Sequence, residues 1–249
     1  MAGTITEIWR YPIKSHGSER LEQANLSPGQ TLPGDRIWAV LHEAAKDAPD
    51  GWISCNNFTR VTKMPMLAAM RAVLSTDETR VTLTHPTRPD LELAPDTDED
   101  LFLEWVRPLM DPSRAQPVRL VKAVDRGLTD SPEPTLSLNN LSSHRAVSQK
   151  IGRELNTLRW RGNVWLDGLG PWEEFEWVGR KIKLGTAELD VVEPIGRCLA
   201  TAANPETGRR DADTLGALMD GWNHQNFGVY AVVTKSGVIS EGDTAQLIA

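Results

Sequence analysis

Residues 193–208 read EPIGRCLATAANPETG, and this stretch decides how the chain is interpreted. It follows an apolar alternation at 187–192, whose period of two predicts a strand. The Asn-Pro and Thr-Gly pairs near its end are turn signals, so the strand stops before them. The sequence therefore predicts that Cys198 lies at a strand end, beside Arg197, where its side chain can face a cleft.

The Cys198 thiol has two interpretations on local sequence alone. A neighbouring cation such as Arg197 favours the thiolate, which is the form that binds metals or attacks substrates. Most free cysteines are instead small buried hydrophobes. A single thiol is weak evidence for a site, so the local sequence leaves both interpretations open.

The composition predicts a folded globular protein of 249 residues, of which 40% are hydrophobic and nine are Trp. Its 27 basic and 34 acidic residues give a net charge of −7, which disfavours a general nucleic-acid binder but not a local basic pocket. No run approaches the roughly 20 apolar residues of a membrane span, and the start does not resemble a signal peptide. With two cysteines, Cys55 and Cys198, and no disulfide framework, we expect a reduced cytoplasmic protein.

Short alternating segments separated by turn clusters predict a mainly β fold with a few helices (α+β). Strands of this kind in close succession are typical of a barrel or sandwich. The expected strands are 4–9, 37–41, 67–74, 80–84, 162–166, 181–184 and 187–192, with a closing hairpin of 229–234 and 238–240. The expected helices are 96–109, 140–155 with Asn139 as N-cap, and 213–222.

The expected helix at 96–109 marks the end of the first domain. Its acidic first turn suits the helix dipole, and Leu101, Trp105 and Leu109 form an apolar stripe at four-residue steps. An Asp-Pro pair ends the helix, so we place the domain boundary after residue 112.

Several familiar site motifs do not occur in the sequence. There is no glycine-rich dinucleotide or phosphate loop, no Gly-x-Ser-x-Gly elbow and no Cys-x-x-Cys. The five histidines show neither His-x-His nor i,i+4 spacing, which gives a zinc or non-haem iron site little support. A metal bound by Cys198 would therefore need its other ligands from outside any local cluster of protein groups.

A wider pattern surrounds Cys198: Arg-Cys is followed by a Thr and then by x-Pro-Glu-Thr-Gly. This pattern resembles the core signature of the MOSC domain family, which includes the mitochondrial amidoxime reducing component and its bacterial relatives. The N-terminal part is similar to the β-barrel domain that precedes MOSC domains in this family. Further matching blocks occur in the family's order at 8–15, 34–40, 161–166, 227–233 and 237–243.

The resemblance implies an N-terminal MOSC-associated β-barrel domain at 1–112, packed on a MOSC β-barrel domain at 113–249, with a cofactor cleft between them. It also implies a molybdenum ion held by the dithiolene of molybdopterin. Cys198 would be the catalytic residue and the single protein thiolate ligand of the metal. A soft thiolate suits such a centre, and the dithiolene brings the sulfur ligands that the local sequence lacks.

The phosphate of the pterin needs cations and amide donors, for which Arg offers bidentate hydrogen bonds and Lys a point charge. Each assignment has a structural alternative, because Lys and Arg are usually solvated at the surface and an Asp before Ser-Pro is an ordinary turn residue. By resemblance, the cofactor-binding residues are Lys14, Ser15, Arg36, Asp130, Ser131, Arg161, Asn163, Arg197 and Thr201.

The resemblance implies an oxidoreductase that removes oxygen from small N-hydroxylated substrates such as amidoximes and hydroxylamines. Without a flavin motif or cluster ligands, the chain is expected to take electrons from a separate ferredoxin, flavoprotein or cytochrome-like protein. Two alternatives stay open: a non-redox molybdenum cofactor carrier or sulfur-transfer protein, and a β-barrel interaction module. Asn204 stands where the eukaryotic reductases have Asp, and Ala202 where they have Thr, and both departures bear on the substrate more than on the cofactor.

Overall fold

The computed structural model describes residues 2–46 and 51–248. Its largest substructure is a closed barrel of β-strands. The last strand of the ring pairs back to the first, and the short strand β2 (Glu19–Leu21) extends the sheet from β1. In order around the ring, the strands are β10 (Val164–Asp167), β9 (Thr135–Asn140), β13 (Asn226–Lys235), β12 (Ala187–Gly196), β11 (Lys181–Leu184), β15 (Thr244–Leu247) and β1 (Ala2–Arg10).

Apolar side chains at every second position of the strands fill the inside of the barrel. In β12, Ala187, Leu189 and Val191 are buried, whereas Asp190 between them is exposed. Burying one aliphatic side chain of this size contributes about 1.5–3 kcal/mol, so the period of two decides which face of the strand lies inside. The barrel interior is therefore a packed core, and a ligand site has to lie at its edge.

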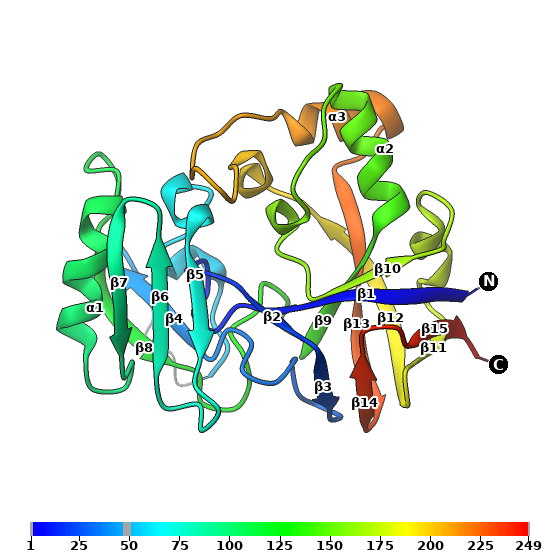
Figure 1. Ribbon diagram of the computed structural model, residues 1–249, viewed down its shortest axis with the longest axis horizontal. Helices are drawn as coiled ribbons and strands as arrows, with labels where there is room; N and C mark the ends of the chain where they lie inside the picture. Colours follow the sequence, from blue (N-terminus) through cyan, green and yellow to red (C-terminus); the bar gives the residue numbers. More distant parts are fainter. Residues whose placement is uncertain (1, 47–50, 249) are drawn as a thin grey trace.

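The N-terminal half forms a second body beside the barrel, on the left in Figure 1. Its elements are a sheet of β5 (Arg71–Leu74), β6 (Val81–His85) and β7 (Arg88–Leu93), a pair of β4 (Trp38–His42) with β8 (Pro117–Lys122), and the helix α1 (Glu99–Val106). Trp38, Phe102 and Val106 lie in the hydrophobic core that these elements enclose.

Strands from each half of the chain pair with strands from the other half. β1, from the start of the chain, belongs to the barrel, and β3 (Gln23–Leu26) pairs with β14 (Gly237–Ser240). β4 pairs with β8, which follows residue 112 in the sequence. Strands from the two sides of residue 112 thus pair with each other, and the boundary itself stays a prediction of the sequence.

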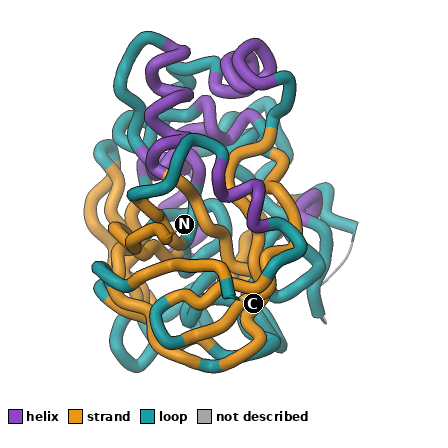
Figure 2. The backbone as a smooth tube through the Cα atoms, turned by 90° about the vertical axis from the view of Figure 1, so that its right-hand side faces the viewer, coloured by secondary structure: helices purple, strands orange, loops and turns teal. Residues whose placement is uncertain are grey.

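Two helices, α2 (Leu141–Ile151) and α3 (Thr214–Trp222), pack against each other and cover one end of the barrel. Figure 2 shows the helical segments gathered toward this end, with the strands below them. Beneath them the rings of Trp160 and Phe227 stack with centroids 3.8 Å apart. The short 3-10 helices are Cys55–Asn57, Pro65–Ala69, Arg107–Leu109, Thr157–Trp160, Glu173–Trp177 and Leu199–Ala202.

The expected closing hairpin at 229–234 and 238–240 is wrong. β13 pairs with β12 and β9, whereas β14 pairs with β3. Both edges of β13 are already occupied inside the barrel, so the next strand finds a partner elsewhere. Sequence alternation shows that both segments are strands but does not show their neighbours.

The expected strand at 67–74 is only partly correct. Residues 65–69 form a 3-10 helix and the strand β5 begins at Arg71. Pro65 lies in the first turn of the 3-10 helix, where the fixed φ of proline is tolerated and its missing N–H costs nothing. The apolar run at 67–69 therefore packs from a helical turn rather than from a strand.

The apolar stripe expected on the first helix is also wrong at Leu101, whose exposed fraction is 44%. The buried face of α1 consists of Phe102, Leu103, Trp105 and Val106. The α-helix ends at Val106, and Leu109 is buried from the following 3-10 turn. Pro108 lies in that turn, and helices commonly end before a proline.

The second helix is shorter than expected and has a different cap. Asn140, not Asn139, is its N-cap and accepts the N–H of Ser142. Gly152, with a φ of 83°, ends it. Asn139 stays in β9, where its amide has another use described below.

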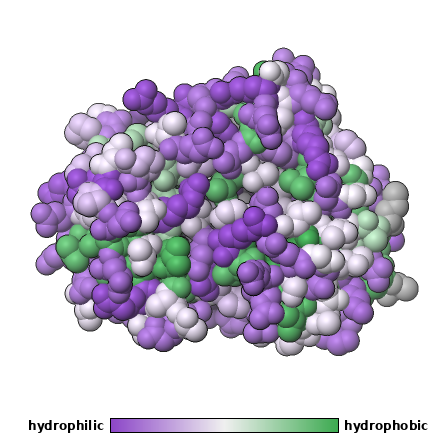
Figure 3. Space-filling view, in the orientation of Figure 1, coloured by the Kyte–Doolittle hydropathy of each residue, from purple (hydrophilic) through white to green (hydrophobic). Residues whose placement is uncertain are grey.

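The mainly β fold with a few helices is confirmed. Among the described residues, no helix combines the length and apolarity that crossing a membrane requires. Polar side chains cover most of the face in Figure 3, and apolar ones form small scattered patches there. Single exposed apolar residues of this kind are ordinary on a protein surface.

Candidate functional site

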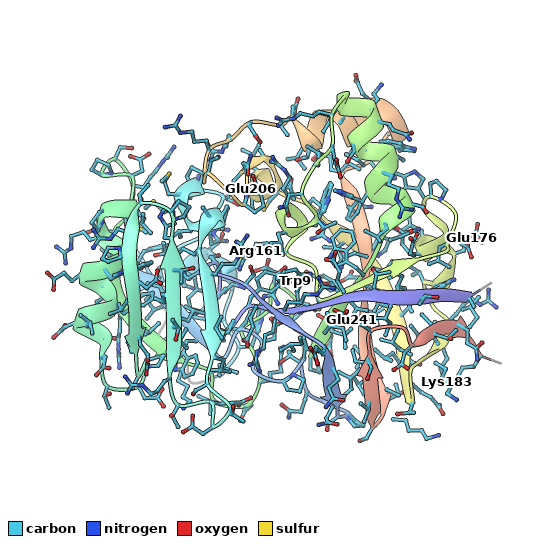
Figure 4. All side chains as sticks on the ribbon, in the orientation of Figure 1. Trp9, Arg161, Glu176, Lys183, Glu206 and Glu241 are labelled. Atoms are coloured by element: carbon cyan, nitrogen blue, oxygen red, sulfur yellow. The ribbon has the colours of Figure 1, made fainter. Side chains whose placement is uncertain are left out.

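A cavity of about 300 Å³ lies where the two halves of the chain meet. Arg161, one of its lining residues, lies near the centre of the molecule in Figure 4, between the β5–β7 sheet and the barrel. Residues from before position 112 that line it are Lys14, Ser15, Arg36, Cys55, Arg60, Val61 and Thr62. Those from after it are Thr129, Asp130, Thr135, Ser137, Arg159, Trp160, Arg161, Asn163, Ile195, Gly196, Arg197, Cys198, Ala200, Thr201 and Tyr230.

The cavity brings together every predicted site residue except Ser131. Ser131 is buried behind the wall, where its Oγ accepts the N–H of Glu133 at 3.1 Å and its carbonyl accepts the hydroxyl of Thr129 at 3.2 Å. It therefore shapes the loop that carries Asp130. Those that line the cavity are Lys14, Ser15, Arg36, Asp130, Arg161, Asn163, Arg197, Cys198 and Thr201, and their roles toward a cofactor stay predictions.

Cys198 lies just beyond the end of β12, as its strand-end position predicted, and it is exposed. It is the N-cap of the 3-10 helix Leu199–Ala202. Its Sγ lies 3.1 Å from the Oγ1 of Thr62, a residue of the other half of the chain. Because the sulfur is accessible from the cavity, the interpretation as a buried hydrophobe does not hold.

Thr201 holds the turn that presents Cys198. Its hydroxyl donates to the carbonyl of Cys198 at 3.0 Å and lies 2.6 Å from the hydroxyl of Thr214 at the start of α3. Thr201 is buried, so its side chain stabilises the 3-10 turn rather than reaching far into the cavity. In this chain, the Thr of the sequence pattern therefore stabilises the turn that follows Cys198.

Arg197 is fixed by internal acceptors. Its guanidinium donates to the carbonyls of Trp160 at 2.7 Å and Phe227 at 2.6 Å, and to Oδ1 of Asn139 at 3.1 Å. Burial lowers its pKa to about 10, although nearby Tyr230 and Cys198 act in the opposite direction. The guanidinium thus supplies positive charge beside Cys198 while most of its N–H groups are already used.

Asn163 is likewise committed to the protein. Its Oδ1 accepts the backbone N–H and the hydroxyl of Ser137, both at 3.1 Å, and its Nδ2 donates to the carbonyl of Trp9. It ties β9 and β1 together beside the cavity, and its side chain is buried. Asn163 therefore sets the shape of the wall.

Lys14 and Asp130 form an ion pair across the cavity wall. The Nζ of Lys14 donates to Asp130 at 2.6 Å and to the carbonyl of Leu128 at 2.7 Å. Burial lowers the pKa of Lys14, and Asp130 partly offsets this effect. The Asp130 side chain is exposed to the cavity, yet desolvation by the surrounding walls raises its pKa, and Lys14, with smaller contributions from Arg36 and Arg161, lowers it to about 2. The Asp130 carboxylate is therefore charged at neutral pH.

Arg36 and Arg161 both lie against the ring of Tyr11, with guanidinium carbons 4.8 and 4.4 Å from its centroid. Arg36 pairs with Asp35 and donates to the carbonyl of Arg161 at 3.1 Å. Burial raises the pKa of Tyr11 to about 12 and lowers that of Arg161 to about 10. Arg161 has no carboxylate partner within the part of the chain that the structure describes.

Backbone strain accompanies these residues. Ser15, Arg36 and Arg161 have φ angles of 67°, 56° and 51°, which are uncommon for residues other than glycine. Residues held in such conformations cost about 1–3 kcal/mol each and cluster at ligand sites. Three of them around one cavity support the interpretation that this cavity binds a ligand.

Much of the polar lining of the cavity has no recognisable pattern in the sequence. Arg60 and Thr62 follow no periodic segment, and no sequence signal marks them. Arg159 lies two residues before the block at 161–166, and Tyr230 lies inside the block at 227–233, so the family pattern could have identified both. The lining residues that the sequence did not mark as site residues include Cys55, Arg60, Thr62, Thr129, Thr135, Ser137, Arg159, Trp160 and Tyr230.

The cavity lining is strongly basic although the whole chain is acidic. It contains six Lys and Arg residues, and Asp130 is the one carboxylate among its lining residues in the described ranges 2–46 and 51–248. The Nε atoms of Arg60 and Arg159 and the hydroxyl of Thr135 are buried and find no hydrogen-bond partner among the described residues. Because buried polar atoms are normally paired, this lining fits a bound anion such as a phosphate group.

A metal held only by side chains of the protein has no support in the structure. No group of three or more His, Cys, Asp or Glu within residues 2–46 and 51–248 could hold a metal ion. Cys198 at the rim of a basic cavity is instead suited to add one soft ligand to a metal that arrives inside an anionic cofactor.

Two family models match the chain and together span most of it. The MOSC N-terminal beta barrel domain matches residues 2–105, and the MOSC domain matches residues 125–246. The chain therefore belongs to the MOSC family, and this membership indicates a function related to the molybdenum cofactor.

The chain is distantly similar to two curated mammalian proteins. Mitochondrial amidoxime-reducing component 1 of Mus musculus is 22% identical, and the match covers 99% of this chain and 82% of that protein. The protein of the same name from Homo sapiens is 21% identical, with 99% and 83% covered.

The chain is also similar to solved structures of two bacterial proteins. The YUAD protein of Bacillus subtilis is 11% identical with a TM-score of 0.47, and the match covers 98% of this chain and 94% of that one. YiiM of Geobacillus stearothermophilus is 21% identical with a TM-score of 0.38, covering 53% and 67%. Both TM-scores are below 0.5, so the family assignment depends on the two family models.

Proposed function

We propose that this protein binds the molybdenum–molybdopterin cofactor and uses it to reduce small N-hydroxylated compounds. The observation that carries the proposal is the exposed sulfur of Cys198 at a cavity with six cationic side chains and one carboxylate. In this proposal Cys198 is the single protein thiolate on the metal. When bound, the cofactor supplies the redox chemistry that cleaves an N–O bond.

The remaining residues divide into those that bind the cofactor and those that shape its site. Arg161 and Arg36 stack on Tyr11 and present positive charge toward the cavity, where a phosphate would be bound. Ser15 lies beside Lys14 in the same wall. Arg197, Asn163 and Thr201 position the wall and the turn of Cys198 through the internal hydrogen bonds described above.

Substrate reduction takes two electrons and two protons, so that an N-hydroxyl compound R–NH–OH gives R–NH2 and water. In this proposal the electrons come from a separate redox protein of the ferredoxin, flavoprotein or cytochrome type, since the sequence holds no flavin motif. The similarity to proteins named as amidoxime-reducing components supports an N-hydroxylated substrate. The cytoplasmic location likewise stays a prediction of the sequence.

The test is metal analysis and turnover of protein produced in a host that makes the cofactor. We expect near-stoichiometric molybdenum and reduction of benzamidoxime with an artificial electron donor. Cys198→Ala should abolish turnover, whereas Cys55→Ala, which removes the other thiol, should not. Protein without molybdenum would contradict the whole proposal, and stoichiometric molybdenum without turnover would support the cofactor carrier instead.

A further inference from the structure

A hydrogen-bonded contact joins the two halves of the chain at Cys198. The Oγ1 of Thr62 lies 3.1 Å from the Sγ of Cys198, although the residues are 136 positions apart. The Thr62 hydroxyl has no other hydrogen-bond partner within residues 2–46 and 51–248. Thr62 is half-buried and lines the same cavity as the sulfur.

Further contacts hold Thr62 in this position. The guanidinium of Arg210 donates to the carbonyl of Thr62 at 2.6 Å. Arg210 forms an isolated β-bridge with Ala203, which directly follows the 3-10 helix capped by Cys198. The loop that carries Thr62 is thus anchored to the segment that carries the sulfur, and the hydroxyl is held against it.

The charge of the sulfur decides the direction of the hydrogen bond. A protonated thiol could donate to Thr62, but a thiolate has no proton and can only accept. If Cys198 is a metal ligand, it is deprotonated, so the Thr62 hydroxyl must be the donor. A hydrogen bond to a ligand sulfur withdraws electron density from it, and such bonds are known to tune reduction potentials.

We propose that Thr62 is a positioning residue that donates a hydrogen bond to the Cys198 sulfur, stabilises its thiolate and raises the reduction potential of a metal bound there. The second part rests on the proposed function, whereas the first concerns the protein without cofactor. No sequence motif marks Thr62, and it comes from the half of the chain that does not contain Cys198. The N-terminal half would thereby adjust the chemistry of a ligand in the C-terminal half.

The first test measures alkylation of Cys198 in cofactor-free protein, in a Cys55→Ala background that leaves one thiol. A free thiol is mostly protonated at pH 7, so a variant with less thiolate reacts more slowly with iodoacetamide. Thr62→Val keeps the shape and removes the hydroxyl. We expect its rate at pH 7 to fall about threefold to tenfold, since a hydrogen bond to a charged group is lost.

Two comparisons make this result specific. Thr62→Ser keeps a hydroxyl and should restore most of the rate. At higher pH the thiolate fraction rises in both proteins, so the rates of Thr62→Val and its parent should converge or reverse, because a hydrogen-bonded thiolate is the weaker nucleophile. If Thr62→Val does not fold, Thr62→Ala against Thr62→Ser gives the same comparison. Equal rates at pH 7 for proteins with and without the hydroxyl would overturn the proposal.

The second test measures the midpoint potential of molybdenum in loaded protein by a redox titration followed by electron paramagnetic resonance. Thr62→Val should shift the potential downward, and Thr62→Ser should stay close to the parent. An unchanged potential would overturn the tuning of the metal. If no molybdenum is bound at all, the proposed function fails, and the alkylation result still decides whether Thr62 acts on the sulfur.

Discussion

The ammonium of Lys14 lies 2.6 Å from a carboxylate oxygen of Asp130, and the two side chains differ greatly in exposure. The exposed fraction is 5% for the side chain of Lys14 and 65% for that of Asp130. The cation is therefore enclosed in the wall, while its counter-ion faces the open cavity. Removing either partner leaves a charge behind, but in two very different environments.

We expect Asp130→Asn to destabilise the protein more than Lys14→Met does. Asp130→Asn leaves a buried ammonium without its counter-ion, which should lower the free energy of unfolding by about 1–3 kcal/mol after screening by the cavity. Lys14→Met leaves an exposed carboxylate that water can solvate, so its cost should be smaller. Urea unfolding of both variants and the double variant at pH 7 checks this order, and the reverse order would contradict it.

The sequence predicted five of the seven barrel strands, because their alternation shows the buried face, but it did not predict β9 and β15. β9 is buried at every position and therefore shows no alternation. In β11 the expected and observed bounds agree, since Ile182 and Leu184 alternate with lysines. The pairing partners of the strands were harder to predict from the sequence. β3 pairs with β14, which lies more than 200 positions further along the chain, so no local pattern marks the pair. The stripe failed at Leu101 because the buried face of α1 is centred on Phe102 and Val106, which leaves Leu101 on the exposed side.

The site was predictable only where the sequence carried a family pattern. Cys198, Arg161 and Lys14 lie in such blocks, and all three line the cavity. Composition alone gave no hint of them, because the chain is acidic overall while the cavity is basic. Arg60 and Thr62 stayed hidden, since their place at the cavity follows from tertiary packing of a loop without periodicity.

Gly228 illustrates how close packing supports Arg197. Its φ is 70°, and a Cβ there would lie 2.7 Å from Oδ1 of Asn139, the atom that accepts the Arg197 guanidinium. Gly228→Ala should therefore lower the free energy of unfolding by about 2–4 kcal/mol, through backbone strain together with the clash. Urea unfolding measures the loss.

A second glycine separates strain from the clash. Gly29 has a similar φ of 74°, but nothing lies within 4 Å of a Cβ built on it. Gly29→Ala should cost about 1 kcal/mol, which is the strain alone. Equal losses for Gly29→Ala and Gly228→Ala would show that the packing against Asn139 has no energetic weight.

Arg161 should be unfavourable for the stability of the protein without ligand and favourable for binding an anion. Burial lowers its pKa to about 10, and within the described residues it has no ion-pair partner. Arg161→Met should raise the free energy of unfolding of cofactor-free protein by about 1 kcal/mol and reduce the molybdopterin content of protein from a host that makes it.

The control for Arg161→Met is Arg20→Met. Arg20 is exposed and pairs with Glu241 at 2.8 Å, outside the cavity. Its replacement should change the free energy of unfolding by less than about 0.5 kcal/mol and leave the molybdopterin content unaltered. A loss of stability in Arg161→Met with unchanged cofactor content would mean that Arg161 is structural.

His16 should make stability depend on pH below neutrality. It is fully buried, its Nδ1 donates to the carbonyl of Lys14 at 2.7 Å, and burial lowers its pKa to about 4. The unfolded chain takes up a proton near pH 6.5, whereas the folded protein does not until about pH 4, so stability is present above pH 6.5 and is lost as pH falls toward 4. This one group should remove about 2 kcal/mol between pH 7.5 and pH 5. His16→Asn keeps an N–H donor but cannot titrate, and every other ionisable group is common to both proteins. Urea unfolding at the two pH values should therefore show a smaller loss in His16→Asn by that amount. Equal losses would mean that burial does not lower the pKa of His16 in the folded protein.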